Sequence, residues 1–238
     1  MILHTEIQGS GEAIVFLHTG LQTSKTDFIQ QQALFSENYQ VISPDLRGHG
    51  MSASMDISNF FEDSANDLNE TFENLGLESV HLAGASLGAL VAICFAKRFP
   101  DKVKTLILSG VTKEKPSNWK ILHQQDANMQ ASLLDNAEAV SYFTELHGAG
   151  WKRFIELGQS EDWYPFNETS DLSAIACPIL VIAGESSPNE CRSAVEYSSA
   201  QENIHISIIP FASHLVHNEQ PEAYSEVMGR FLLNIEKL

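Results

Sequence analysis

A serine lies at the centre of a glycine-flanked turn near the middle of the chain. Residues 84–88 read Gly-Ala-Ser-Leu-Gly, with the apolar run Val80–Ala83 before them and good helix formers from Ala89 to Phe99 after them. These runs predict a strand, a tight turn and a helix in succession. In such a turn the hydroxyl of Ser86 stands at the positive end of the helix, which favours developing negative charge. Ser86 is therefore predicted to be a nucleophile.

A serine hydroxyl attacks only when a base removes its proton. Among nine histidines, His214 follows the last strand-like run, Ile204–Ile209, at the edge where the carboxyl ends of parallel strands meet. We therefore predict His214 as the base. His217, three residues later, could form a metal-binding pair with His214, but no carboxylate or thiol spacing supports this. Neither a metal ion nor a cofactor is expected.

The negatively charged oxygen formed during attack on a carbonyl needs backbone N–H donors. The N–H of Leu87, directly after Ser86, is one candidate. A second can come from Gly20 or Leu21, in the loop after the strand-like run Ala13–Leu17, because glycine lets the backbone approach a substrate closely. These residues are predicted to form an oxyanion hole.

The elements that must position these residues alternate along the chain. Apolar runs of strand length are mostly separated by helical patterns, which predicts an α/β fold with a mostly parallel central sheet flanked by helices. The predicted strands are Ile2–Ile7, Ala13–Leu17, Val41–Ser43, Val80–Ala83, Lys104–Leu108, Ile179–Ala183 and Ile204–Ile209. The predicted helices are Lys25–Phe35, Phe60–Leu75, Leu87–Phe99, Asn189–Ser199 and Pro221–Ile235.

The alternation stops between residues 112 and 170, where the sequence is helical and rich in aromatic residues. We predict that residues 112–170 form a helical cap, inserted into a core domain made of residues 1–111 and 171–238. Trp119, Trp151 and Trp163 lie in this segment and are predicted to contact the substrate. The alternative is that these rings form the small core of the cap itself.

The amino-acid composition excludes some classes of binding partner. The 238 residues include 31 acidic and 14 basic side chains, a formal charge of −17, which repels nucleic acids and anionic membranes. The three cysteines have no metal or redox spacing, no signal-like segment begins the chain, and no run reaches membrane-spanning length. We expect a cytoplasmic protein that binds a small acyl substrate, and either a monomer or a homodimer.

Five segments, in order along essentially the whole chain, resemble the α/β-hydrolase superfamily, in its capped, esterase-like branch with a serine nucleophile. This resemblance implies that Ser86 is the nucleophile, His214 the base, and residues 112–170 the cap between the family's sixth and seventh strands. It also implies that Gly20 and Leu87 belong to the oxyanion region. The segments are FLHTG at 16–20, SPDLRGHGMS at 43–52, GASLG at 84–88, PILVIAGE at 178–185 and FASHLVHNEQPEAY at 211–224.

The same resemblance excludes some of the reactions that members of the superfamily catalyse. A serine at position 86 excludes the epoxide hydrolases and haloalkane dehalogenases of the superfamily, which attack with an aspartate. Proline iminopeptidases usually carry HGGPG where this chain has HTGLQ, so aminopeptidase activity is disfavoured. Asp45, Arg47 and Gly48 resemble a structural turn of the family.

The acid that should orient His214 departs from the family pattern. Relatives usually carry an aspartate after the seventh strand, and Ser187 stands at that position here. The histidine needs a carboxylate to hold its tautomer. We take Glu190 as that acid, with Glu185 as the alternative. Glu114, after the preceding strand, is a further candidate. The remaining possibility is that the chain has no such acid.

The predicted function is hydrolysis of a small carboxylic ester, thioester or lactone through an acyl-Ser86 intermediate. The alternative is a non-catalytic or weakly active ligand-binding protein on the same scaffold, because Ser187 replaces the usual acid. Acyl transfer and carbon–carbon bond hydrolysis use the same serine and histidine, so these motifs do not separate them from ester hydrolysis.

Overall fold

A seven-stranded sheet forms the centre of the computed structural model, which describes residues 1–235 and 237. The strand order is β1-β3-β2-β4-β5-β6-β7, with β1 antiparallel to β3 and all other neighbours parallel. This is the mostly parallel α/β sheet that the sequence predicts. The strands are β1 Thr5–Gly9, β2 Glu12–Leu17, β3 Tyr39–Pro44, β4 Val80–Ala85, β5 Val103–Ser109, β6 Ile179–Gly184 and β7 Ile204–Ile209.

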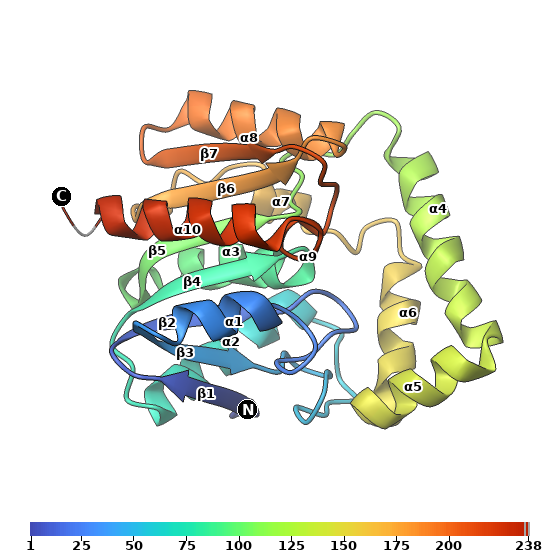
Figure 1. The fold of residues 1–238 in the computed structure, drawn as a ribbon. Coiled ribbons are helices and arrows are strands. Elements are labelled where there is room, and N and C mark those ends of the chain that lie inside the picture. Colours follow the sequence, from blue (N-terminus) through green and yellow to red (C-terminus); the bar gives the residue numbers. More distant parts are fainter. Residues whose placement is uncertain (236, 238) are drawn as a thin grey trace.

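Helices cover both faces of the sheet (Figure 1). Along β2, Val15 and Leu17 pack into the core under α2, α3 and α8, whereas Ile14 and Phe16 pack under α1 and α10. A strand buried on both faces needs an unbroken apolar run rather than an alternating one, as the sequence AIVFL provides. The flanking helices are α1 Ile29–Phe35, α2 Phe60–Asn74, α3 Leu87–Arg98, α8 Pro188–Ala200, α9 Val216–Glu219 and α10 Pro221–Ile235.

Helix α1 begins four residues later than predicted. Phe28 has a φ of 55°, in the left-handed region, and so interrupts any helix that would start at Lys25. Residues 23–27 instead form turns, in which the N–H groups of Thr26 and Asp27 donate to the carbonyl of Thr23. The segment before α1 is therefore a structured loop at the carboxyl end of β2.

The chain between β5 and β6 is helical and contains no strand among its described residues. Figure 1 shows α4, α5 and α6 standing beyond the carboxyl ends of the parallel strands, as a layer separate from the helices that cover the sheet. We call these three the cap helices. They are α4 Trp119–Ser132, α5 Ala137–His147 and α6 Lys152–Gly158; the short α7 Phe166–Thr169 follows, and the 3-10 helices are η1 Pro100–Lys102, η2 Leu133–Asp135 and η3 Gly148–Trp151.

No helix in the described part of the chain combines the length and the apolar character needed to cross a bilayer. The division into a core domain and a cap at residues 112 and 170 stays a prediction.

Candidate active site

Ser86 occupies the sharp turn between β4 and α3. Its backbone has a φ of 50° and a ψ of −118°, a conformation that side chains rarely adopt, and it caps the N-terminus of α3. Only glycine fits at position 88, because a Cβ there would lie 2.1 Å from the carbonyl oxygen of Leu17. The turn thus places a serine hydroxyl at the end of a buried strand, at the positive end of a helix.

The side chains of Ser86, His214 and Glu190 form one hydrogen-bonded chain. His214 Nδ1 lies 2.7 Å from Glu190 Oε1, and His214 Nε2 lies 2.9 Å from Ser86 Oγ. A carboxylate can only accept, so Nδ1 carries the proton and Nε2 is free to accept the serine proton. A hydroxyl, an imidazole and a carboxylate joined in this order are the arrangement that serine-based acyl chemistry requires.

Glu190 reaches His214 from the first turn of α8. It is 9% exposed, and negative charge is favourable at this helix N-terminus. The Ser187 side chain cannot supply the carboxylate, but Glu190 lies three residues further on and is one methylene longer than aspartate. The other candidates are elsewhere: Glu185 is exposed after β6, and Glu114 pairs with Lys113.

The pKa of His214 is raised above its ordinary value of 6.5. Burial disfavours the charged ring, but the hydrogen bond and the negative charge of Glu190 outweigh that effect. Although 47% of the side chain is exposed, the exposed part faces a cavity under the cap. A raised pKa makes the ring a stronger base toward Ser86.

Space for this ring is provided at the end of β5. Gly110 has a φ of 68°, and a Cβ there would lie 2.9 Å from His214 Cε1. The preceding residue, Ser109, accepts the backbone N–H of Ser86 through its carbonyl oxygen at 2.9 Å. The strand next to β4 therefore holds the backbone of Ser86 and leaves the space that the ring of His214 occupies.

A cavity of about 830 Å³ opens between the carboxyl ends of the strands and the cap helices, and all three side chains line it. The predicted oxyanion residues Gly20, Leu21 and Leu87 line it as well. Leu87 is the first residue of α3, and the first N–H groups of a helix have no intrahelical acceptor. Other lining residues include Leu90, Trp119, Asp126, Phe154, Leu157 and Trp163.

Of the three predicted substrate-contacting tryptophans, Trp119 and Trp163 line this cavity and Trp151 does not. Trp151 is fully buried, packs against Phe143 at a ring distance of 5.2 Å, and donates its indole N–H to Thr144. The prediction is wrong for this residue because the short helix η3 turns the ring into the cap's own core. The helix η3 contacts both α5 and α6.

Comparison with known proteins agrees with this geometry. A family model described as alpha/beta hydrolase fold matches residues 12–172. The chain belongs to the α/β-hydrolase family. Its relatives include the (E)-2-((N-methylformamido)methylene)succinate hydrolase of Acinetobacter baylyi, 26% identical over 94% of this chain and 92% of the relative. The serine hydrolase BPHL of Mus musculus is 23% identical over 97% of this chain and 82% of the relative.

Solved structures share the fold of this α/β-hydrolase. NosK from Streptomyces actuosus superimposes with a TM-score of 0.81 at 24% identity, covering 94% of this chain and 99% of NosK. A thermophilic esterase from Thermogutta terrifontis superimposes with a TM-score of 0.72 at 23% identity, covering 98% of this chain and 93% of the esterase. The chain is therefore similar over nearly its whole length to hydrolases of this family.

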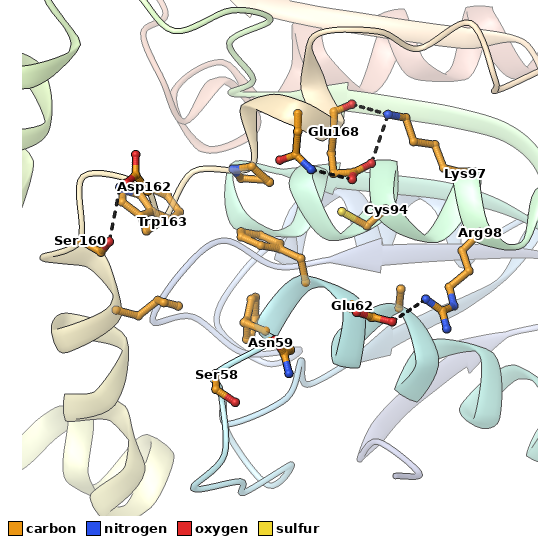
Figure 2. Close-up of a pocket in the computed structure, with 16 residues that line it drawn as sticks. Ser58, Asn59, Glu62, Cys94, Lys97, Arg98, Ser160, Asp162, Trp163 and Glu168 are labelled. Atoms are coloured by element: carbon orange, nitrogen blue, oxygen red, sulfur yellow. Dashed lines mark hydrogen bonds and ion pairs between the residues drawn. The ribbon is translucent and has the colours of Figure 1, made fainter.

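A second cavity of the α/β-hydrolase, about 610 Å³, lies beside α2 and α3 and holds none of the residues predicted for catalysis (Figure 2). Its charged side chains are largely paired, Lys97 with Glu168 and Arg98 with Glu62. Trp163 lines both cavities, and so does Leu157. These two side chains form the wall between the second cavity and the one that Ser86 faces.

His217, considered above as a metal partner of His214, binds a different carboxylate. Its Nε2 lies 2.8 Å from Asp27 Oδ1, and both side chains are essentially without solvent contact. Asp27 also accepts the backbone N–H and the hydroxyl of Thr19, next to the predicted oxyanion residues. No sequence pattern predicts this pair, because its members are 190 residues apart and no local motif connects them.

The sequence interpretation of Asp45 as a structural residue agrees with its contacts. Its two carboxylate oxygens accept backbone N–H groups of Ser24 and Met51, at 2.8 and 2.9 Å. Asp45 is buried and does not line the cavity that Ser86 faces. It therefore holds two loops together rather than facing a substrate.

Proposed function

We propose that this protein is a serine hydrolase that cleaves a small, uncharged carboxylic ester, thioester or lactone through an acyl-Ser86 intermediate. The observation that carries the proposal is the continuous hydrogen-bonded chain from Ser86 through His214 to Glu190, facing a cavity large enough for a small ester. Family membership and relatives named as hydrolases support it.

In the proposed mechanism, His214 Nε2 removes the Ser86 proton as the oxygen attacks the carbonyl carbon. The N–H of Leu87 and that of Gly20 or Leu21 stabilise the negative charge on the carbonyl oxygen. The protonated His214, stabilised by Glu190, then donates its proton to the leaving alcohol or thiol. A water deprotonated by His214 releases the acid and restores Ser86.

The preference for an uncharged substrate follows from the side chains around the cavity. Among the described residues that line it there is neither lysine nor arginine, while Asp126 and Glu190 are acidic. A carboxylate in the substrate would lose its hydration without gaining a cationic partner. The Acinetobacter relative is named for a succinate derivative, and we propose that this chain has a different specificity.

Two alternatives were raised by the sequence. A non-catalytic scaffold was suggested by Ser187, and the bond between Glu190 and His214 argues against it. Acyl transfer and carbon–carbon bond hydrolysis would use the same side chains with another acceptor or another leaving group. Identification of the products separates these reactions from ester hydrolysis.

The free thiols Cys94, Cys177 and Cys191 fit the proposed cytoplasmic location.

The test compares 4-nitrophenyl butyrate with 4-nitrophenyl hemisuccinate, which has a similar chain length and a terminal carboxylate. We expect wild type to favour the butyrate in kcat/KM by at least about tenfold, and Ser86→Ala to lower kcat by about 10⁴-fold or more. Ser199→Ala, an exposed serine on α8, is the matched control and should keep full activity. Undiminished hydrolysis by Ser86→Ala would contradict the proposed mechanism. A preference for the hemisuccinate would contradict the proposed specificity for uncharged substrates.

A further inference from the structure

The loop that carries the second oxyanion donor, residues 18–21, is held at two carbonyl groups by two different histidines. His18 Nδ1 lies 2.8 Å from the carbonyl oxygen of Thr19, and His147 Nε2 lies 3.0 Å from that of Leu21. We call residues 18–21 the oxyanion loop. His18 belongs to the loop itself, whereas His147 is the last residue of α5, a cap helix.

The contacts of His147 determine which nitrogen carries its proton. The backbone N–H of Gly50 donates to His147 Nδ1 at 2.9 Å, so Nδ1 must be unprotonated. Nε2 therefore carries the proton and donates it to the Leu21 carbonyl. One neutral tautomer satisfies both bonds, and the side chain is buried, with the residue only 2% exposed.

These two carbonyl contacts hold one peptide group that carries an oxyanion N–H and one that follows directly after the loop's second candidate N–H. Peptide groups are planar, so fixing the Thr19 carbonyl fixes the N–H of Gly20 on the opposite side of the same plane. The N–H of Leu21 belongs to the next peptide group, which lies between the two that the histidines hold. Leu21 also has a φ of 59°, which costs a leucine about 1 kcal/mol and needs support from its surroundings.

The groups packed around His147 keep it neutral. Burial lowers its pKa, the nearby ring of His18 lowers it further, and the hydrogen bond to Leu21 and the charge of Asp45 oppose these effects. The ring of His49 packs edge-on against His147 at 5.4 Å, and burial lowers the pKa of His49 as well. A neutral His147 keeps Nδ1 available as the acceptor for Gly50.

We propose that His147 is a positioning residue: it links the cap to the oxyanion loop, so that the oxyanion hole is correctly formed only when α5 is seated on the core. This inference rests on the proposed function, because it assigns a role in stabilising the charge that forms after attack by Ser86. It adds a requirement that the triad alone does not contain, namely that a cap side chain prepares the site for the transition state.

Two amide substitutions separate the two bonds of His147. In His147→Gln the amide nitrogen lies near the place of Nε2 and can still donate to Leu21, whereas in His147→Asn the amide oxygen lies near the place of Nδ1 and can accept only from Gly50. We expect His147→Asn and His147→Ala to lower kcat on 4-nitrophenyl butyrate by about 10- to 100-fold, less than the loss of a donor itself. KM should change less than about threefold, and His147→Gln should keep kcat within about threefold.

A boronic acid inhibitor provides a second readout, since its tetrahedral adduct with Ser86 places an oxygen in the oxyanion hole. Its inhibition constant should weaken about tenfold or more in His147→Asn and remain near wild type in His147→Gln. The control is His123→Gln, because His123 is a buried cap histidine that contacts the carbonyl of Gly158 and not the oxyanion loop. It should lower the melting temperature without changing kcat by more than about twofold.

The outcomes distinguish this inference from the proposed function. A wild type without Ser86-dependent hydrolysis overturns both. An active wild type in which the Asn and Gln variants have equal kcat overturns the role of His147 alone, as does a kcat loss in His123→Gln as large as in His147→Asn. If His147→Ala does not fold, the Asn and Gln pair decides.

Discussion

The molecule contains two carboxylate–histidine pairs whose histidines are three residues apart in the chain. His214 binds Glu190 at 2.7 Å and His217 binds Asp27 at 2.8 Å. The first histidine is 47% exposed onto the cavity, whereas the second has no exposed side-chain surface. Its ring stacks on Phe28 at 4.2 Å, and its Nδ1 has no partner among the described residues.

The two pairs show that a short hydrogen bond to a carboxylate does not by itself make a histidine a base. What differs is the second ring nitrogen, which meets the hydroxyl of Ser86 in one pair and no nucleophile in the other. The partner carboxylates also differ in the hydrogen bonds that they accept. Asp27 accepts five, which hold the loops around it, whereas Oε2 of Glu190 accepts none from the described residues.

Glu190→Gln should have the largest effect. The amide keeps the size of the side chain but not its charge, and it allows the wrong tautomer of His214, so kcat should fall by about 10³- to 10⁴-fold. Hydrolysis requires neutral His214 and is lost as the pH falls through its pKa. Because Glu190 raises that pKa, wild type should lose half its kcat/KM above pH 6.5, and the variant at a lower pH. A pH profile of kcat/KM for both proteins checks this. The same midpoint on the acidic side in wild type and variant would contradict it.

Asp27→Asn should affect stability more than catalysis. Removing the charge from a buried pair costs about 3 kcal/mol or more, which corresponds to a fall in melting temperature of about 10 °C for a chain of this size. Urea unfolding and thermal melting measure these quantities. The turnover of the folded variant should fall less than tenfold, and a loss as deep as that of Glu190→Gln at an unchanged melting temperature would abolish the contrast between the pairs.

The pH dependence of that stability difference has a defined sign. Burial opposes ionisation of Asp27, but hydrogen bonds from His217 and Thr19 hold its pKa well below the ordinary 3.8. A lowered folded-state pKa stabilises the protein above the unfolded value and is lost as the pH falls. The advantage of wild type over Asp27→Asn should therefore be complete at pH 7 and shrink below about pH 4.

Glu185→Gln should have the smallest effect, and it makes the same chemical change as Glu190→Gln five residues earlier. The side chain is exposed after β6 and faces solvent. We expect kcat to stay within about twofold and the melting temperature within about 1 °C. A tenfold fall in kcat would mean that Glu185 takes part in catalysis in solution.

The fold and two members of the proposed triad follow from local sequence. The apolar run before Ser86 and the glycine after it are enough to predict the turn, and His214 is marked by its place after the last strand. Glu190 is harder to predict, because its carboxylate reaches His214 only once the loop and the first turn of α8 have taken their path. The sequence of residues 184–190 does not indicate whether Glu190 or Glu185 reaches His214.

Other features depend on contacts between distant segments. Trp151 and Trp163 lie in the same aromatic-rich segment, yet one packs inside the cap and the other lines both cavities. His147 has no motif around it, and its bond to Leu21 joins residues 126 positions apart. Such pairings depend on how the cap sits on the core, which periodicity within a segment cannot specify.

The backbone of Ser86 also has a consequence for how this chain evolves. Its φ of 50° and ψ of −118° belong to a region where a side chain costs about 1 to 3 kcal/mol and glycine costs little. Selection for stability alone would therefore favour glycine at position 86, and only the hydroxyl opposes that change. A lineage that no longer used the proposed reaction would be free to replace this serine with glycine.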